Sequence, residues 1–100
     1  MPHPLSFTSG DTIRFTVLFE VAGVATDPTA VTFRTRNPNK VVTSYVYLTD
    51  AEVVRVSTGS FRIDLQFDLP GMWYHRWEGT GTAPGASEDR VKIEKSQVIG

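Results

Sequence analysis

The chain has no cysteine among its 100 residues. It therefore has no disulfide, no thiolate metal site and no cysteine nucleophile. Small extracellular domains are often stabilised by disulfides, so this absence favours assembly in a reducing cytoplasm. The opening segment, MPHPLSFTSG, also lacks the cationic and apolar stretches of a secretory signal. From these two absences we expect a small cytosolic product.

Long apolar runs and an excess of positive charge are missing as well. No apolar stretch approaches the roughly 18–20 residues that cross a bilayer. Lysine and arginine number 10 against 11 acidic residues, and no two basic residues are adjacent. We therefore expect no membrane and no nucleic acid among the partners, and a solvated surface of mixed charge.

Helical periodicity and internal repeats are absent, and alternation of apolar with polar residues takes their place. This period of two is typical of a strand with one buried and one exposed face. The clearest cases are residues 60–68 and 72–78, which are separated by Leu69-Pro70-Gly71. We predict that these segments are two antiparallel strands that pair with each other.

Shorter segments of the same kind occur along the whole chain. The pattern predicts further strands at residues 5–8, 12–21, 31–36, 41–48, 53–56 and 90–94. Residues 22–28 and 79–86 are predicted loops, the second of them mobile. Residues 49–52 have the form of a capping box, which predicts one helical turn at most.

For one predicted strand, the sequence does not decide which face points toward the core. In residues 41–48, either Val42 and Val46 or Tyr45 and Tyr47 face the core. Taken together, the short strands and regular turns predict an all-β antiparallel sandwich of about seven strands, with a small barrel as the alternative.

The length corresponds to a single domain. We divide the chain into an N-terminal arm and lead-in strand at 1–8, the sandwich at 9–95, and a C-terminal tail at 96–100. The expected core consists of the large aromatic residues on the inward faces. They are Phe15, Phe19, Phe33, Phe61, Phe67, Trp73 and Trp77.

Residues with catalytic chemistry are sparse. His75 shares a strand face with Trp73 and Trp77, so we interpret it as a core residue rather than a base or metal ligand. His3 is interpreted as an exposed residue of the arm. No serine, histidine and aspartate set can be assembled, and the glycines at 79–81 precede no helix that would hold phosphate. We expect no catalytic residue, no cofactor and no metal.

The acidic residues are interpreted as surface groups. Asp64 and Asp68 lie on the polar face of one strand, which favours solubility over a glycosidase pair. The pairs at 50/52 and 88/89 lack the ligand spacing of a calcium loop. Three tyrosines are the candidates for a surface that stacks against glycan. They are Tyr45, Tyr47 and Tyr74.

An ordered set of turn motifs adds a family resemblance across residues 9–81. The motifs are Gly10-Asp11-Thr12, Asp27-Pro28-Thr29, Tyr45-Val46-Tyr47, Thr58-Gly59-Ser60-Phe61, Pro70-Gly71-Met72-Trp73 and Arg76-Trp77-Glu78-Gly79. In this order they resemble the small immunoglobulin-like proteins encoded by tailed bacteriophages. The resemblance implies an immunoglobulin-like sandwich.

The same resemblance implies a function without catalysis. The expected role is structural, in the virion, as a head decoration, a neck or head–tail component, or an accessory tail protein. The expected partners are capsid, neck or tail subunits, with assembly in the host cytoplasm, and we expect residues 1–7 or 96–100 to contact another subunit. The alternatives are a soluble binding module for glycan or a host-surface target, and an unrelated bacterial interaction domain.

Overall fold

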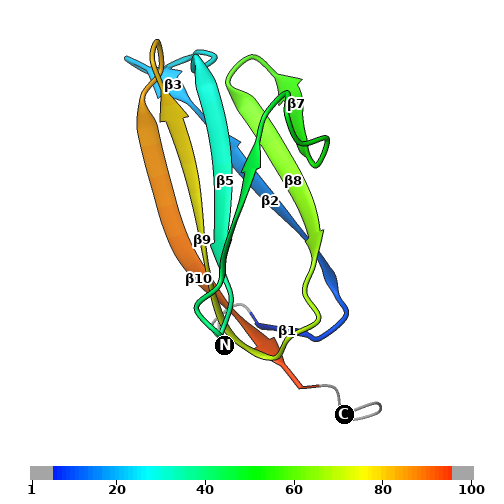
Figure 1. The fold of residues 1–100 in the computed structure, drawn as a ribbon. Coiled ribbons are helices and arrows are strands. Elements are labelled where there is room, and N and C mark those ends of the chain that lie inside the picture. Colours follow the sequence, from blue (N-terminus) through cyan, green and yellow to red (C-terminus); the bar gives the residue numbers. More distant parts are fainter. Residues whose placement is uncertain (1–5, 96–100) are drawn as a thin grey trace, which may run out of the picture.

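The computed structural model describes residues 6–95, which form strands and turns without any helix. Within this range no helix is long and apolar enough to cross a membrane. The strands are β1 (Ser6–Thr8), β2 (Thr12–Leu18), β3 (Glu20–Val21), β4 (Val24–Ala25), β5 (Ala30–Arg36), β6 (Val42–Val46), β7 (Val53–Ser57), β8 (Ser60–Gln66), β9 (Gly71–Thr80) and β10 (Gly85–Glu94) (Figure 1).

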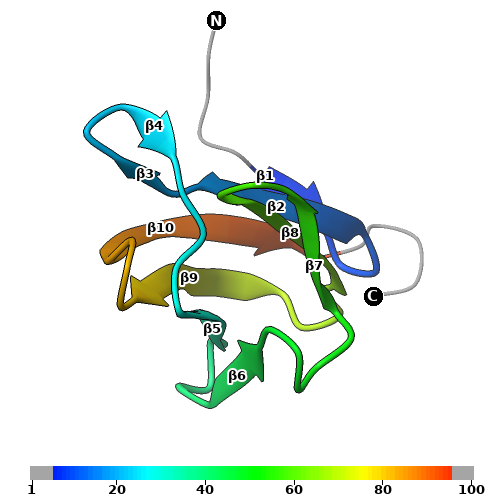
Figure 2. The same cartoon turned by 90° about the horizontal axis from the view of Figure 1, so that it is seen from above.

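These strands form two facing sheets and a small hairpin. The front sheet has the order β1-β10-β9-β5-β6, the back sheet has the order β2-β8-β7, and β3 pairs with β4. Figure 2 shows the two sheets as separate layers. The order corresponds to the immunoglobulin sandwich, in which strands G, F, C and C′ face strands B, E and D. The prediction of an all-β, immunoglobulin-like sandwich is confirmed, and β1 adds one parallel pairing to β10.

The prediction that the two clearest strands pair with each other is wrong. β8 pairs with β2 and β7 in the back sheet, whereas β9 pairs with β5 and β10 in the front sheet. A hairpin would place both apolar faces on the same side of one sheet. Instead residues 67–70 carry the chain across to the other sheet, so that the apolar faces of β8 and β9 face each other.

The core lies between the two sheets. Six of the seven expected core aromatics are buried, and Trp73 is partly buried at its edge. The Trp73 ring stacks on Phe67 with centroids 4.4 Å apart, and its indole N–H donates to the Leu69 carbonyl at 2.8 Å. Aliphatic residues complete the core. They are Ile13, Val31, Val53, Ile63, Ala83, Val91 and Ile93.

Aromatic contacts join the two sheets across the core. Phe15 of β2 lies 4.4 Å from His75 of β9 and 5.2 Å from Phe33 of β5, measured between ring centroids. In antibody domains a disulfide joins the strands that correspond to β2 and β9. Here aromatic pairs connect the two sheets in place of a disulfide. Each pair stabilises the fold by roughly 0.5–1.5 kcal/mol beyond the effect of its buried area.

The predicted loop at 22–28 contains a hairpin, and residues 49–52, which were predicted to hold one helical turn at most, form turns. Within predicted loop 22–28, β4 pairs with β3 across Ala22 and Gly23, whose φ angles of 52° and 81° fit a two-residue type I′ turn. Residues 49–52 form turns without a helical turn. The Asp50 carboxylate there accepts the backbone N–H of Val46 at 2.8 Å, so it closes the end of β6.

Two of the turn motifs meet in space. The Asp27 carboxylate pairs with Arg55 at 3.0 Å and accepts the Gly59 N–H at 2.7 Å. Both contacts favour the carboxylate, Arg55 more strongly, and they lower the pKa of Asp27. Gly59 has a φ of 74°, and a Cβ there would lie 2.5 Å from the Phe19 carbonyl oxygen. The motifs at 27–29 and 58–61 therefore have a structural reason, because they fasten one end of the back sheet.

Candidate functional site

The three candidate tyrosines lie on opposite sides of the front sheet. Tyr45 is in register with the buried Phe33, and both Tyr45 and Tyr47 pack against the core. The Tyr47 ring lies 5.1 Å from that of Phe61, and burial raises the pKa of Tyr45. Tyr74 alone lies on the outer face. The open choice for residues 41–48 is thus settled in favour of the tyrosines facing inward, and no common tyrosine surface forms.

His75 lies inward, on the face that also carries Trp73 and Trp77. Its imidazole packs on Phe15 and lies 6.0 Å from the Phe33 ring centroid. This burial lowers the pKa of His75, although the charges of Asp89 and Glu88 oppose the shift. Its neighbours are those of a core residue at the edge of the sandwich. His3 lies outside the described residues.

Most of the acidic candidates are exposed. Asp64 pairs with Arg14 of β2 at 2.8 Å on the outer face of the back sheet, and this contact lowers the pKa of Asp64. Within residues 6–95 no group of three or more histidine or acidic side chains is placed to hold a metal ion. The residues at 88 and 89 flank β9 rather than forming a loop.

The outer face of the front sheet brings together arginines from different strands. Across the sheet, Arg36 of β5 lies beside Tyr74 of β9, and Tyr74 lies beside Arg90 of β10. The guanidinium carbon of Arg36 lies 5.0 Å from the centre of the Tyr74 ring. This is a cation–π contact, and such a contact between exposed side chains stabilises a protein by about 0.5–1 kcal/mol. We call Arg36, Tyr74 and Arg90 the tyrosine row.

A second row crosses the sheet next to the first. Arg34 of β5 lies beside Arg76 of β9, and Arg76 lies beside Glu88 of β10. Glu78 forms ion pairs with both Arg34 and Arg76, and Arg76 also contacts Glu88 at 3.3 Å. These pairs are solvated and each contributes about 0–1 kcal/mol. Their main effect is to fix where the guanidinium groups point.

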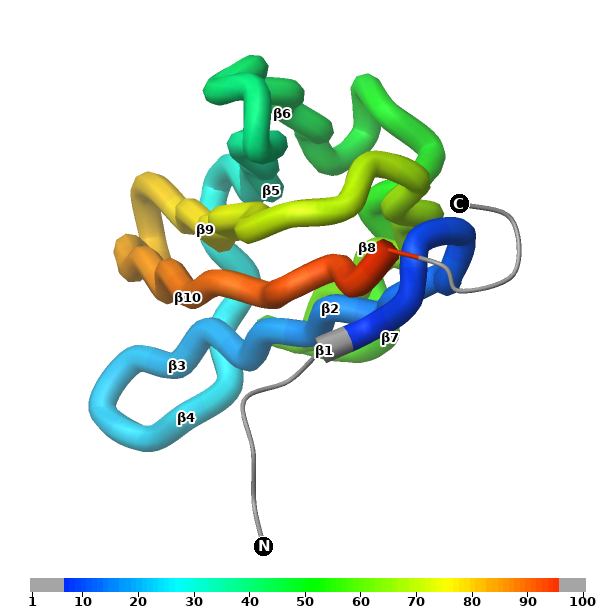
Figure 3. The backbone as a smooth tube through the Cα atoms, turned by 90° about the horizontal axis from the view of Figure 1, so that it is seen from below, coloured from blue at the N-terminus to red at the C-terminus, as the bar shows by residue number. Residues whose placement is uncertain are grey.

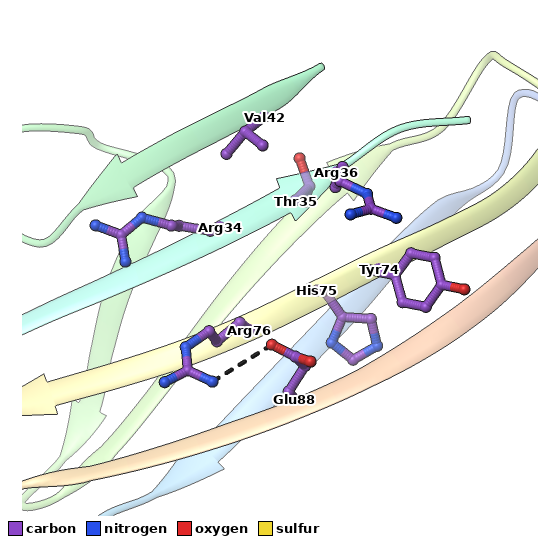
Figure 4. Close-up of a pocket in the computed structure, with 8 residues that line it drawn as sticks. All are labelled: Arg34, Thr35, Arg36, Val42, Tyr74, His75, Arg76 and Glu88. Carbon is purple, nitrogen blue, oxygen red and sulfur yellow. Dashed lines mark hydrogen bonds and ion pairs between the residues drawn. The ribbon is translucent and has the colours of Figure 1, made fainter. Parts of the chain in front are cut away.

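An open groove of about 410 Å³ lies between the two rows. Arg36 and Tyr74 line one side, Arg34 and Arg76 the other, and Glu88 lies at the end formed by β10 (Figure 4). The three arginines of this groove outnumber Glu88 and the paired Glu78 by one charge, although the whole chain has a formal net charge of -1. This groove brings charged side chains of β5, β9 and β10 together, and it is the candidate site.

The sequence alone did not indicate this site. Its charges were interpreted as part of a solvated mixed surface, because basic and acidic residues are nearly equal in number and no two basic residues are adjacent. The alternation of Arg34 and Arg36 with the buried Phe33 and Thr35 was visible, and it placed two arginines on one face. Only the register of β5, β9 and β10 brings the other arginines beside them.

Comparisons with known proteins do not identify a family for this chain. No family model matches the chain, and no relative was found among curated proteins.

Proposed function

We propose that the chain is a non-enzymatic structural component of a tailed-bacteriophage virion, an immunoglobulin-like domain that docks on other virion proteins. The family resemblance of the turn motifs suggests this role, and the fold is the one the resemblance implies. The role covers head decoration, neck or head–tail component, and accessory tail protein. The observation that carries the docking itself is an open edge of the front sheet.

That open edge belongs to β10. β1 pairs only with Lys92, Ile93 and Glu94, so Gly85–Val91 has no second partner strand among residues 6–95. Figure 3 follows β10 along the border of the sheet, with β1 beside its final part. Residues 85–90 are all exposed. Unpaired N–H and C=O groups on such an edge accept an extended segment of another chain.

The opposite edge of the sheet is partly closed. The Asp50 side chain accepts the Val46 N–H, and the Val46 carbonyl accepts the N–H groups of Thr49 and Asp50 at 3.0 and 2.8 Å. These contacts occupy backbone groups at one end of β6. The contrast with β10 supports docking through β10.

The test begins with virions of the phage whose genome carries this gene. We expect the protein in purified virions, its absence after gene deletion, and saturable rebinding of the purified protein to the deleted particles in sedimentation. The plateau would give the copy number. A stable protein that neither occurs in virions nor rebinds would contradict the proposal and leave the alternative of a free module for glycan or a host-surface target.

Single cysteines locate the contact, because the chain has none of its own. Ala86→Cys places a photo-crosslinker on β10, and Thr16→Cys places it on the exposed face of β2 as the matched control. We expect cross-linking to a virion protein from position 86 and little from position 16. Equal cross-linking from both positions would show that β10 is not the docking edge.

A further inference from the structure

Two arginines of the tyrosine row have no acidic partner. Among residues 6–95 no carboxylate lies within ion-pairing distance of Arg36 or Arg90. In the second row, by contrast, Arg34 and Arg76 share Glu78. The guanidinium carbon of Arg36 lies 5.0 Å from the centre of the Tyr74 ring, and this contact with the ring leaves the guanidinium group without a carboxylate among the described residues.

The two unpaired arginines lie on either side of Tyr74. The groove of about 410 Å³ reaches Tyr74 from the side of Arg36, and a smaller hollow of about 150 Å³ reaches it from the side of Arg90. Arg36 and Arg90 are two strands apart, which corresponds to about 10 Å. Alternate side chains of an extended segment are about 7 Å apart, so two of them reach both guanidinium groups.

The chemistry of this surface fits carboxylates of a protein. A guanidinium group donates two parallel hydrogen bonds to a carboxylate, and the phenol ring of Tyr74 offers apolar contact between the two positions. Glu88 and Asp89 line the hollow beside Arg90. Their charges oppose a nucleic acid, which carries many closely spaced phosphates, more strongly than a segment with two carboxylates.

We propose that an extended acidic segment of a neighbouring virion protein docks across the tyrosine row, with one carboxylate on Arg36 and a second on Arg90. This inference rests on the proposed virion function and names the chemistry of the partner. It is continuous with the open edge, because Arg90 follows directly on residues 85–89 of β10.

Nuclear magnetic resonance titration of the whole chain tests the chemistry directly. The probe is a short extended peptide with a Glu-Thr-Glu centre, and the control probe has Gln-Thr-Gln. We expect the acidic peptide alone to shift the Arg Nε–Hε signals and the amide signals of β5, β9 and β10. High salt should weaken the binding, because screening reduces attraction between exposed charges.

Two double variants with the same change in net charge distinguish binding at the tyrosine row from general electrostatic attraction of the acidic peptide. In the double variant Arg36→Gln and Arg90→Gln we expect the dissociation constant to rise by about tenfold or more, since charged hydrogen bonds are lost. The control, Arg14→Gln with Arg62→Gln, removes the same charge from the outer face of the back sheet. There we expect a change within about twofold, because these arginines are far from the row.

Three results would overturn the inference. The first is no binding of the acidic peptide, or equal binding of the glutamine peptide. The second is an equal loss in both double variants, which would indicate attraction by net charge only. The third is binding of a sialylated trisaccharide at the same signals without peptide binding, which would assign the groove to an anionic glycan.

Rebinding to gene-deleted virions distinguishes this inference from the function on which it rests. If the native chain rebinds and the Arg36→Gln, Arg90→Gln variant does not, both are supported. Equal rebinding of the two would remove the acidic segment as the partner and leave the virion role intact. If the native chain itself fails to rebind, the virion role fails, and the peptide titration alone decides what the groove binds.

Discussion

The two faces of the central strands β5 and β9 differ in almost every respect. On the inner face, Phe33 and Trp77 are in register with their rings 4.7 Å apart, and both are buried. On the outer face, the next residues, Arg34 and Arg76, are solvated and both form ion pairs with Glu78. Because side chains alternate along a strand, one backbone carries both chemistries. The inner face accounts for stability, and the outer face is free to evolve recognition.

The largest expected effect is a truncation on the inner face. Phe33→Ala removes a ring that is 0% exposed, and it should lower the free energy of unfolding by about 3–5 kcal/mol. The control on the next residue is Arg34→Ala, for which we expect a loss of about 1 kcal/mol or less. Urea unfolding of the two variants checks the pair. A loss as large in the control would contradict the division between the faces.

The tyrosines repeat this comparison with matched side chains. Tyr47→Ala removes a partly buried ring that packs on Phe61, so we expect a loss of about 2–3 kcal/mol, less than for a fully buried ring. Tyr74→Ala removes a ring from the outer face and its contact with Arg36, with an expected loss of about 1 kcal/mol. Similar losses for the two tyrosines would mean that they do not lie on opposite faces as described.

Most of the strand pattern could be predicted from the sequence. The alternation in residues 31–36 and 60–68 identified which side chains are buried, because the period of two depends only on the local backbone. Phe15, Phe33 and Phe61 followed from it directly. The turn chemistry around Pro38 also marked where β5 ends.

The pairing of strands could not be predicted in the same way. Residues 67–70 look like a hairpin turn, but they carry the chain between sheets, and local pattern does not distinguish these two outcomes. The inward face of β6 had the same problem, because valines and tyrosines both fit a buried position. The candidate site depends on pairing, since Arg36, Arg76 and Arg90 meet only across strand registers.

His75 is where the inner face meets solvent, and its titration should make stability depend on pH. Burial lowers the pKa of His75 in the folded chain, so the unfolded chain binds its proton first, from about pH 6.5 downward. The neutral His75 therefore contributes its full stabilisation of the folded chain above this pH. This stabilisation is lost as the pH falls from about 6.5 to the pKa of His75 in the folded chain.

Urea unfolding between about pH 7.5 and pH 5 measures this dependence, in a range where carboxylates stay ionised. We expect His75→Gln to flatten the decline in stability on acidification, and His3→Gln, the control, to leave it unchanged. Both variants remove one imidazole. An unchanged pH dependence in His75→Gln would show that the ring is equally solvated in the folded and unfolded chains.

The smallest expected effect on stability belongs to the surface that we propose for binding. Arg36 and Arg90 have no acidic partner among residues 6–95, so Arg36→Gln with Arg90→Gln should change the free energy of unfolding by less than about 1 kcal/mol. The expected loss is the cation–π contact with Tyr74, partly offset by relief of repulsion among the arginines of this face. Thermal unfolding of the variant beside the native chain measures the difference.

A large loss of stability in this double variant would remove the contrast between the two faces, because it would show that the outer arginines help to hold the sheet together. Near-native stability of the variant combined with weaker binding of the acidic peptide would support the contrast between the two faces. Unpaired guanidinium groups on an exposed sheet add little to folding, so their clustering around Tyr74 is better explained by something that the folded domain binds than by the fold itself.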